Sequence, residues 1–315
     1  YENVVKWGLP KMLVSSQDPK DFGALPELFD AMLVDAPCSG SGLFRKDPDA
    51  TAHWSPATVS LCSQRQQRIL ADAMPALKEG GMLFYATCSY SVEEDEAVCD
   101  WLLDTMPVEA VDLEVPAEWG IVESRSAKHG AAGYRFYPHR LQGEGFFLSV
   151  FRKITAGDMH SGSGYKTDKP SAAESDTLRL WLNDIDSFRI FRVADQVMAF
   201  PENTWDAYAA IASRFRLRKS GLRLGTFAHG QFNPDHELAM STSLDPGVDS
   251  LDLSLEHSLR YLRRESLDIA SGGKGWVCLR YQGLPLGFAK RLPNRLNNYY
   301  PQEWRIRLEG KGEIG

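Results

Sequence analysis

Two apolar runs in the first third of the chain each end in a turn that contains a cysteine. Phe29–Val34 leads into a turn that contains Cys38, and Met82–Ala86 leads into a turn that contains Cys88. Short apolar runs bounded by turn residues are typical of strands buried on both faces. The carboxyl ends of parallel strands share one edge of an open α/β sheet, and ligands bind there. The sequence therefore predicts that the two cysteines face one pocket.

The residues around these turns alternate between helical and strand patterns. Ser55 and Pro56 suit the start of a helix with an apolar face. Residues 91–94 match a capping box that would start a second helix. Residues 116–145 have the composition of a long loop, and Phe146–Phe151 has that of a further strand. This order of strands and helices favours an α/β fold with a doubly wound sheet.

The second half of the chain differs from the first in composition and in its pattern of expected strands and helices. Residues 155–176 are rich in Gly, Ser and Lys, which is typical of a linker. Residues 177–245 combine a hairpin pattern with helical stretches and indicate a connecting α+β region. Residues 246–309 hold strand patterns around Gly-rich turns, which predict a small β-barrel. The predicted fold class is therefore an α/β sheet followed by a small α+β and β-barrel region.

The composition limits the class of protein. No apolar run approaches the roughly 20 residues that a membrane span needs, and the start of the chain shows no signal peptide. The five cysteines have irregular spacing, with neither a disulfide framework nor a zinc pattern. We therefore expect no membrane association, no metal site and a cytoplasmic location, where thiols stay reduced.

Charge is distributed unevenly along the chain. The net charge of −7, taken alone, argues against binding to nucleic acid. Between Leu255 and Lys311, however, Lys and Arg outnumber Asp and Glu by 11 to 5. A second basic group lies within residues 214–223. Such asymmetry favours a local surface that faces a polyanion, and a solvated basic surface is the alternative.

A pair of thiols suits covalent chemistry at carbon. A thiolate attacks electrophilic carbon readily and leaves readily under the right conditions. One cysteine would act as the nucleophile, and the second, with an aspartate beside it, would give general acid–base assistance. The alternative is that Cys38 and Cys88 are small buried hydrophobic residues, the commonest role of a free cysteine. The other three cysteines fit that alternative better.

The two turns resemble motifs of a known family. Asp35-Ala36-Pro37-Cys38-Ser39-Gly40, followed by residues 44–48 and 54–55, resembles motif IV of the RNA cytosine-5 methyltransferases of the Nop/Sun type. Thr87-Cys88-Ser89, followed by acidic residues 93–96, resembles motif VI of the same family. Together the two motifs are highly specific.

Within that family the chain is most similar to the bacterial RsmF (YebU) subfamily. Gly143–Phe147 resembles the last sheet strand of the subfamily, and Pro285–Gly287 and Asn298–Pro301 resemble its PUA-like RNA-binding domain. The resemblance implies a Rossmann-like methyltransferase sheet in residues 1–154 and a PUA-like β-barrel in residues 246–309.

The resemblance also implies a mechanism. Cys88 would add to carbon 6 of cytosine, after which carbon 5 takes a methyl group from S-adenosylmethionine. Cys38 would assist removal of the carbon 5 proton and release of the product. Asp35 would hydrogen-bond the base or the cofactor, and Pro37 would shape the turn against them.

The expected cofactor site departs from the family. Asp18, at the end of an expected strand at Met12–Val14, matches the acid that contacts adenine, and a turn or capping aspartate is the alternative. The Gly-rich loop and the acidic strand end that bind S-adenosylmethionine in the family have no counterpart in the sequence. In the strand order of the family, the two strands that bear these motifs lie between the Met12 strand and the Phe29 strand. We therefore expect a C-terminal portion whose sheet lacks its middle strands and which is inactive alone, and the opening at Tyr1 without Met fits this expectation.

The resemblance implies rRNA or the small ribosomal subunit as partner. The candidate RNA contacts are the basic residues Arg45, Lys46, Lys290, Arg291 and Arg295, with Arg260, Arg263 and Arg264 nearby. Two alternatives stay open. An RNA-binding module without activity would need only the C-terminal domain. A methyltransferase that modifies an amine with Asp-Pro-Pro chemistry would need no second cysteine, so Cys88 argues against it.

Overall fold

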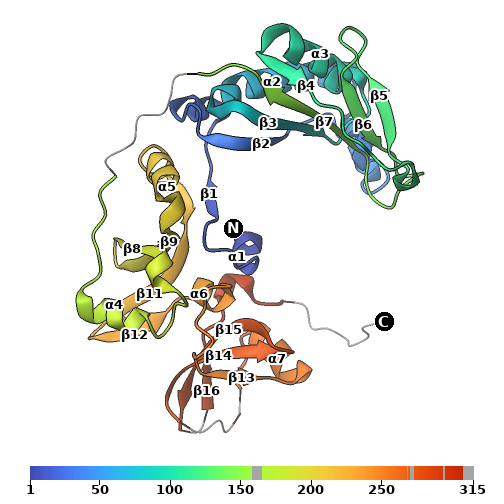
Figure 1. Cartoon of the computed structure of the whole chain (residues 1–315). Coiled ribbons are helices and arrows are strands. Elements are labelled where there is room, and N and C mark those ends of the chain that lie inside the picture. Colours follow the sequence, from blue (N-terminus) through green and yellow to red (C-terminus); the bar gives the residue numbers. More distant parts are fainter. Residues whose placement is uncertain (158–164, 268, 270–272, 294, 308–315) are drawn as a thin grey trace. The chain divides into compact units, whose positions relative to one another are not determined.

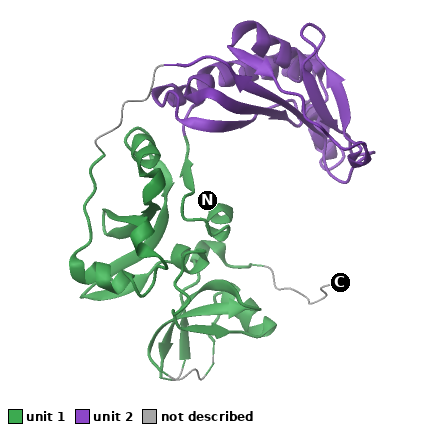
Figure 2. Ribbon diagram, viewed as in Figure 1, with its two compact units in different colours: residues 1–16, 162–315 green, residues 17–161 purple. Residues whose placement is uncertain are grey.

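The computed structural model describes residues 1–157, 165–267, 269, 273–293 and 295–307. The chain forms two compact units, shown in Figures 1 and 2. Residues 17–161 form one, called here the inserted unit, and residues 1–16 with 162–315 form the other, called the flanking unit. Across the described residues, no helix has both the length and the apolar character needed to cross a bilayer.

The inserted unit is built on a six-stranded sheet with the order β2-β3-β7-β6-β5, and β4 pairs with β7 as well. β2 (Phe29–Asp35) and β3 (Leu77–Thr87) run parallel, with Val34 opposite Tyr85. β7 (Phe146–Lys153) runs antiparallel to β3. The turns that follow the two parallel strands therefore leave the sheet at the same edge.

Two α-helices connect the strands of this unit. α2 (Pro56–Ala73) begins at Ser55, whose Oγ accepts a hydrogen bond from the Thr58 N–H at 3.1 Å, as the sequence predicts. It ends in the 3₁₀ turn η4 (Met74–Ala76), where a proline interrupts the helical pattern. α3 (Glu96–Thr105) lies between β3 and β4.

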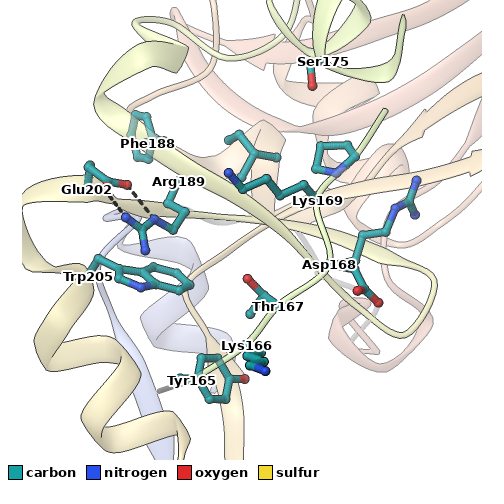
Figure 3. Close-up of a pocket in the computed structure, with 13 residues that line it drawn as sticks. Tyr165, Lys166, Thr167, Asp168, Lys169, Ser175, Phe188, Arg189, Glu202 and Trp205 are labelled. Carbon is teal, nitrogen blue, oxygen red and sulfur yellow. Dashed lines mark hydrogen bonds and ion pairs between the residues drawn. The ribbon is translucent and has the colours of Figure 1, made fainter. Parts of the chain in front are cut away.

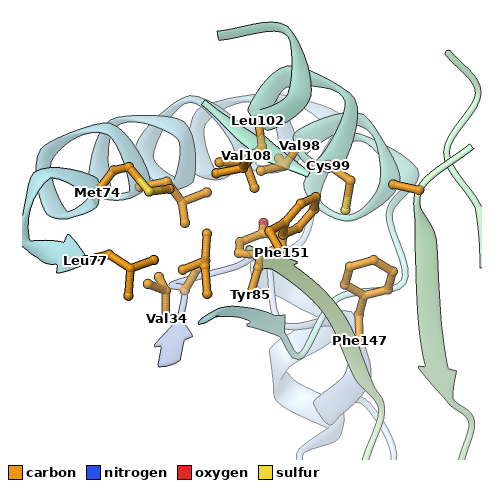
Figure 4. Packing of buried hydrophobic residues seen from close by; sticks show 14 residues of the cluster. Val34, Met74, Leu77, Tyr85, Val98, Cys99, Leu102, Val108, Phe147 and Phe151 are labelled. Atoms are coloured by element: carbon orange, nitrogen blue, oxygen red, sulfur yellow. The ribbon is translucent and has the colours of Figure 1, made fainter. Parts of the chain in front are cut away.

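Both helices cover the same face of the sheet. Tyr85, Phe147 and Phe151 from the strands pack with Val98 and Leu102 of α3 in one buried cluster, which also includes side chains of α2 (Figure 4). Burying these aromatic rings supplies much of the apolar area that stabilises the unit. The doubly wound arrangement expected from the sequence is therefore not found among the described residues, because the sheet has its long helices on one face only.

β2 is less buried than its sequence pattern indicates. Among the described residues no strand pairs with its outer edge, and Leu33 is 66% exposed. A strand paired on one side only leaves backbone groups and alternate side chains open to solvent. The buried pattern predicted for both strands is thus found in β3 and only in part in β2.

An antiparallel hairpin lies within the stretch expected as a long loop. β5 (Val122–Arg125) pairs with β6 (Ala132–Phe136), and β6 pairs with β7. Gly133 in β6 makes room for the ring of Phe147, because a Cβ at this position would collide with that ring. Glycine in a sequence favours a loop prediction, even where packing requires a glycine inside a strand. This explains why a long loop is expected at residues 116–145.

The first strand of the chain belongs to the flanking unit. β1 (Leu13–Ser15) pairs antiparallel with β10 (Leu217–Ser220), and α1 (Glu2–Lys6) precedes it. The sequence predicts a strand here within the methyltransferase-like sheet of residues 1–154, but the strand pairs with β10 of the flanking unit instead. Backbone N–H and C=O groups of a strand need partners, and β10 supplies them.

The flanking unit has two further four-stranded sheets. In the first, of order β12-β11-β9-β8, the hairpin predicted by the sequence forms. Its strands are β8 (Phe188–Val193), β9 (Gln196–Pro201), β11 (Leu222–Ala228) and β12 (Gln231–Pro234). The helix α4 (Ala172–Leu178) begins within the stretch 155–176 expected as a linker, part of which lies outside the described residues.

The second sheet has the order β13-β14-β15-β16. Its strands are β13 (Ser250–Asp252), β14 (Gly275–Tyr281), β15 (Leu284–Leu292) and β16 (Arg295–Asn298). The sheet is open in the described part of the chain, so the expected closed barrel is not observed. The outer strands β13 and β16 are short, and no pairing between them is found among the described residues.

The remaining elements are short. They are η1 (Pro19–Ala24), η2 (Ser41–Leu43), η3 (Pro48–His53), η5 (Val92–Glu94), β4 (Val108–Ala110), η6 (Ala117–Trp119), η7 (Ile185–Ser187), η8 (Glu202–Thr204), α5 (Trp205–Ala212), α6 (His236–Met240), α7 (Leu255–Leu262) and η9 (Gln302–Trp304).

Candidate active site

The turns after β2 and β3 bring two thiols together. Cys38 lies shortly beyond the end of β2, and Cys88 follows β3 directly. Their Sγ atoms lie 2.7 Å apart, and both side chains are partly exposed. The shared edge of the two parallel strands thus produces the adjacency that the sequence predicts.

Backbone hydrogen bonds fix one turn against the other. The Ala36 N–H donates to the Ala86 carbonyl at 2.9 Å, and the Gly42 N–H donates to the Cys88 carbonyl at 2.7 Å. These two bonds lie on either side of Cys38 in the sequence. The main chain therefore holds the thiols next to each other, in addition to the pairing of the strands.

The two thiols differ in acidity. The hydrogen bond between them lowers the pKa of Cys88, and the same bond together with burial raises the pKa of Cys38. The nearby carboxylates of Asp35 and Glu94 act in the opposite direction on Cys88, and burial also raises its pKa. The net effect favours a thiolate on Cys88 that accepts a hydrogen bond from the Cys38 thiol. Because the thiolate is the nucleophilic form, the lowered pKa makes Cys88 the more reactive of the two thiols.

A buried carboxylate between the two turns is missing from the candidates that the sequence suggests. Glu94 is fully buried and accepts hydrogen bonds from the Ser39 N–H at 2.7 Å and the Ser89 hydroxyl at 2.7 Å. The predicted capping box is wrong, because the Ser91 side chain makes no cap hydrogen bond. The acidic residues after Cys88 are a visible signal, but only the tertiary structure shows where this carboxylate points.

An ion-pair group centred on Arg135 lies next to Glu94. The Arg135 Nε donates to Glu96 at 2.8 Å, and its Nη1 lies 3.1 Å from Asp95. Asp95 also accepts a hydrogen bond from the Thr87 hydroxyl at 2.6 Å. Burial, with help from the neighbouring carboxylates, raises the pKa of Asp95 to about 8. One guanidinium thus faces two carboxylates, of which Glu96 is ionised and Asp95 keeps its proton at neutral pH.

Replacing Asp95 by asparagine is expected to remove a pH dependence of stability. The native state holds this proton up to about pH 8, whereas the unfolded chain loses it near the ordinary pKa of 3.8. Unfolding therefore releases a proton between these values, and the free energy of unfolding falls as the pH rises, by at most about 1.4 kcal/mol per pH unit. Urea denaturation at about pH 5 and about pH 8 measures this effect. The variant should gain stability relative to the parent at the higher pH, and a constant difference would contradict the assignment.

The residues expected to contact a cofactor lie beside β2. A groove of about 360 Å³ is lined by mainly apolar side chains of η1, β2 and α2, together with Asp35. Asp18 directly precedes Pro19 of this lining, and its carboxylate caps η1 by accepting from the Lys20 N–H at 3.2 Å. Pro37 is exposed in the turn and is not part of the lining. Of the two aspartates, Asp35 lines the groove, whereas Asp18 is not part of the lining.

The sequence of each part matches a described family. Residues 1–152 match the family described as 16S rRNA methyltransferase RsmB/F, and residues 248–306 match the methyltransferase RsmF PUA domain. Residues 1–152 and 248–306 are called here the methyltransferase domain and the PUA domain, after the families that they match.

Whole proteins of this type are longer than this chain. Ribosomal RNA small subunit methyltransferase F of Escherichia coli O9:H4 (strain HS) and that of Shigella boydii serotype 4 (strain Sb227) are each 30% identical over 315 residues. The alignments cover 96% of this chain and 64% of those proteins, so the chain spans about 64% of the length of these relatives.

Two solved structures from Pyrococcus horikoshii overlap with part of the chain. One is a methyltransferase homolog protein with 33% identity and a TM-score of 0.32, and the match covers 40% of this chain and 39% of that one. The other is NSun6 with SFG, with 24% identity and a TM-score of 0.38, and the match covers 44% of this chain and 34% of that one.

Two candidate RNA contacts of the methyltransferase domain, Arg45 and Lys46, also make polar contacts with other residues of this domain. The Arg45 guanidinium donates to the carbonyls of Pro138, at 3.3 Å, and Gly143. The Lys46 ammonium lies 2.7 Å from Glu144, and both Arg45 and Lys46 are exposed. These contacts hold the loop before β7 against the turn after Cys38, so the two residues have a structural role whether or not they touch RNA.

The other three candidate RNA contacts lie in the PUA domain. A groove of about 620 Å³ contains Arg295 and the exposed Tyr299. Its basic residues are Arg263, Arg264, Arg295 and Arg305. Lys290 lies over the ring of Trp276, 5.3 Å from its centroid, and Arg291 pairs with Asp249. Of the three, Arg295 is thus the one that the structure places in a basic groove.

A larger pocket of about 940 Å³ lies in the first sheet region of the flanking unit (Figure 3). Arg189 in this pocket pairs with Glu202 and lies over the ring of Trp205, 4.5 Å from its centroid. The residues that line it include Lys166 and Lys169 but neither cysteine nor histidine. Size therefore does not mark the reactive site, and the thiol pair of the methyltransferase domain is the better candidate.

Proposed function

We propose that this chain, within a protein of the length of its relatives, is an S-adenosylmethionine-dependent RNA cytosine-5 methyltransferase. The observation that carries the proposal is the pair of thiols, Cys38 and Cys88, 2.7 Å apart at the ends of two parallel strands. Both lie in the part that matches RsmB/F methyltransferases. Methyl transfer to an amine needs no covalent thiol adduct, whereas a pyrimidine carbon must first be activated by one.

The first step is addition of the Cys88 thiolate to carbon 6 of the target cytosine. A carbon–sulfur bond forms, and the electron pair of the 5,6 double bond moves onto carbon 5. S-adenosylmethionine, when bound, would supply the electrophilic methyl group to carbon 5, and its sulfur would keep the electron pair of the broken carbon–sulfur bond and leave as S-adenosylhomocysteine. The lowered pKa of Cys88 supports this role, because a larger fraction of the thiol is ionised at neutral pH.

Cys38 acts in the release of the product. After methylation, carbon 5 carries both its original proton and the new methyl group, so a base must remove the proton before the carbon–sulfur bond breaks. The neighbouring thiolate raises the pKa of Cys38 in the free site. Adduct formation removes that negative charge, which allows Cys38 to lose its proton and act as the base. Asp35, exposed at the end of β2, would hydrogen-bond the cytosine or the amino-acid part of the cofactor.

The groove beside β2 fits part of S-adenosylmethionine. Its apolar walls suit a planar adenine, and the Asp35 carboxylate suits the cationic methionine end. Asp18 is the proposed adenine contact, and Pro37 would shape the turn against the base. Because the Gly-rich loop of the family has no counterpart in the sequence, we propose that residues 1–315 alone do not transfer methyl groups.

The proposed substrate is small-subunit rRNA, naked or within the small ribosomal subunit, in the cytoplasm. The similarity to ribosomal RNA small subunit methyltransferase F supports this choice. The target base must leave its stack to reach the thiols. Contacts with phosphate, which position RNA without reading its sequence, are assigned to Arg45 and Lys46 and to three basic residues of the PUA domain. These three are Lys290, Arg291 and Arg295.

Replacing Cys88 by alanine in a protein extended to the length of the relatives tests the proposal. Transfer of labelled methyl to small-subunit rRNA should place label on cytosine carbon 5 in the parent, and this label should fall below detection in the variant. Cys62→Ala, which removes a partly buried thiol from α2, is the matched control and should keep activity. No label in the parent with any rRNA or subunit, despite tight RNA binding, would favour the binding module instead.

A further inference from the structure

We propose that Glu94 is a positioning residue that holds the two cysteine-bearing turns together and thereby sets the placement of Cys38 against Cys88. This role of Glu94 rests on the proposed function of the thiol pair. Glu94 is fully buried, and in this proposal it acts through the two serines next to the cysteines.

The carboxylate of Glu94 joins both turns directly. Its Oε1 accepts from the Ser39 N–H at 2.7 Å, and its Oε2 accepts from the Ser39 hydroxyl at 2.5 Å. The same Oε2 accepts from the Ser89 hydroxyl at 2.7 Å. Ser39 directly follows Cys38 and Ser89 directly follows Cys88. One side chain thus bonds to the immediate neighbour of each thiol.

Glu94 is itself held firmly in place. It is fully buried, and its backbone carbonyl accepts from the Tyr85 hydroxyl at 2.5 Å. The Gln66 side-chain amide lies 3.3 Å from Oε1 and also donates to the Pro37 carbonyl at 3.1 Å. The network therefore extends from α2 and β3 to both turns. A buried hydrogen-bonded network with every member satisfied fixes a single local geometry.

All partners of the Glu94 carboxylate in the described structure are neutral donors. A buried carboxylate without a cationic partner is costly unless several hydrogen bonds replace its hydration. Ordinary core packing does not require such a group at this position. The free-energy cost of burying the Glu94 carboxylate is explained if this group is needed to join the two cysteine-bearing turns, which no covalent bond connects.

The test measures the reactivity of the Cys88 thiol and needs neither RNA nor cofactor. Iodoacetamide alkylates the thiolate, so the rate of labelling of the Cys88 peptide across pH, followed by mass spectrometry, gives the pKa of this thiol. The titratable groups that interact with Cys88 are Cys38 and Asp35 from the first strand and its turn, Tyr90 from the turn after β3, and Glu94 itself.

Glu94→Ala and Glu94→Gln should move this profile in opposite directions. Alanine releases both turns and weakens the hydrogen bond from Cys38, so the pKa of Cys88 should rise and labelling below that pKa should slow by about tenfold. Glutamine keeps the length and an acceptor for the Ser39 N–H while removing the negative charge, so labelling should become faster. Glu93→Ala, at the exposed neighbouring position, is the matched control and should leave the profile unchanged.

Two further variants make smaller changes and keep the test usable if Glu94→Ala does not fold. Ser89→Ala removes the hydroxyl bond from the second turn to Glu94, whereas Ser39→Ala removes only the hydroxyl bond from the first turn and keeps the bond from the Ser39 N–H. Each variant should slow labelling by less than Glu94→Ala does. In the extended protein, Glu94→Ala should lower kcat for methyl transfer by about 100-fold with KM for RNA unchanged. Glu94→Gln should keep most of the kcat that Glu94→Ala loses.

The outcomes separate the two proposals. A normal Cys88 profile in Glu94→Ala, with only a lower unfolding midpoint, would mean a structural role alone and would overturn the inference. Changes in the same direction for alanine and glutamine would overturn it as well. If the two substitutions shift the Cys88 labelling profile in opposite directions but the extended protein methylates no RNA, the positioning role is supported and the proposed function fails.

Discussion

The extended protein with Cys38 replaced by alanine is expected to stay covalently joined to its RNA. In this variant the Cys88 thiolate can still add to carbon 6, and carbon 5 can still be methylated. Removal of the carbon 5 proton then lacks its base, so the carbon–sulfur bond cannot break. General-base assistance is typically worth about 10²–10⁴-fold, so turnover should fall by that factor while the adduct accumulates.

A denaturing gel with labelled RNA measures this adduct, because a covalent complex migrates with the protein. Cys88→Ala and the double variant should give no shifted band, since both lack the attacking thiol. Cys62→Ala should release its RNA as the parent does. A Cys38→Ala protein that turns over normally, without a retained band, would remove Cys38 from the mechanism.

Gly42→Ala is expected to produce the largest loss of stability near the site. A Cβ at this position would lie 2.5 Å from the Cys88 carbonyl oxygen and 2.6 Å from that of Gly145. Both are backbone atoms, which cannot move aside as a flexible side chain could. Overpacking of this kind costs about 3 kcal/mol, and displacement of the turn should reduce methyl transfer by at least about 100-fold.

Urea denaturation of residues 1–315 measures the change in the free energy of unfolding. Gly23→Ala is the matched control, because a Cβ there meets nothing within 4 Å. Gly40→Ala isolates the backbone effect, since Gly40 has φ +78° with open space around it, and should cost about 1 kcal/mol. A loss for Gly42→Ala no larger than that for Gly40→Ala would show that the turn relaxes and that its close contact with Cys88 is dispensable.

The part of the site that follows from strand order could be predicted from the sequence. Two apolar runs that end in cysteine-containing turns require only that parallel strands share an edge, and the sheet provides this for Cys38 and Cys88. The start of α2 at Ser55 was equally predictable, because a cap depends on neighbouring residues only. Local patterns of this kind survive folding unless a tertiary contact competes with them.

The features that were mispredicted depend on distant partners. Glu94 fits a capping box by spacing, but Ser39, more than fifty positions away, offers its carboxylate a better arrangement. Gly133 gives a loop signal, although the ring of Phe147 requires a glycine in that strand. β1 was recognised as a strand, but its neighbour could not be known, since strand pairing is decided by which edges remain open.

The pairing of β1 with β10 also sets an order of assembly during synthesis. Leu13 cannot meet Ser220 until the whole inserted unit has left the ribosome. All strands of the six-stranded sheet, by contrast, come from within residues 17–161, so this sheet can close early. Domains generally fold as units, the N-terminal ones first. The thiol pair can therefore form before the C-terminal part of the flanking unit is made, while residues 1–16 wait for their partner strand.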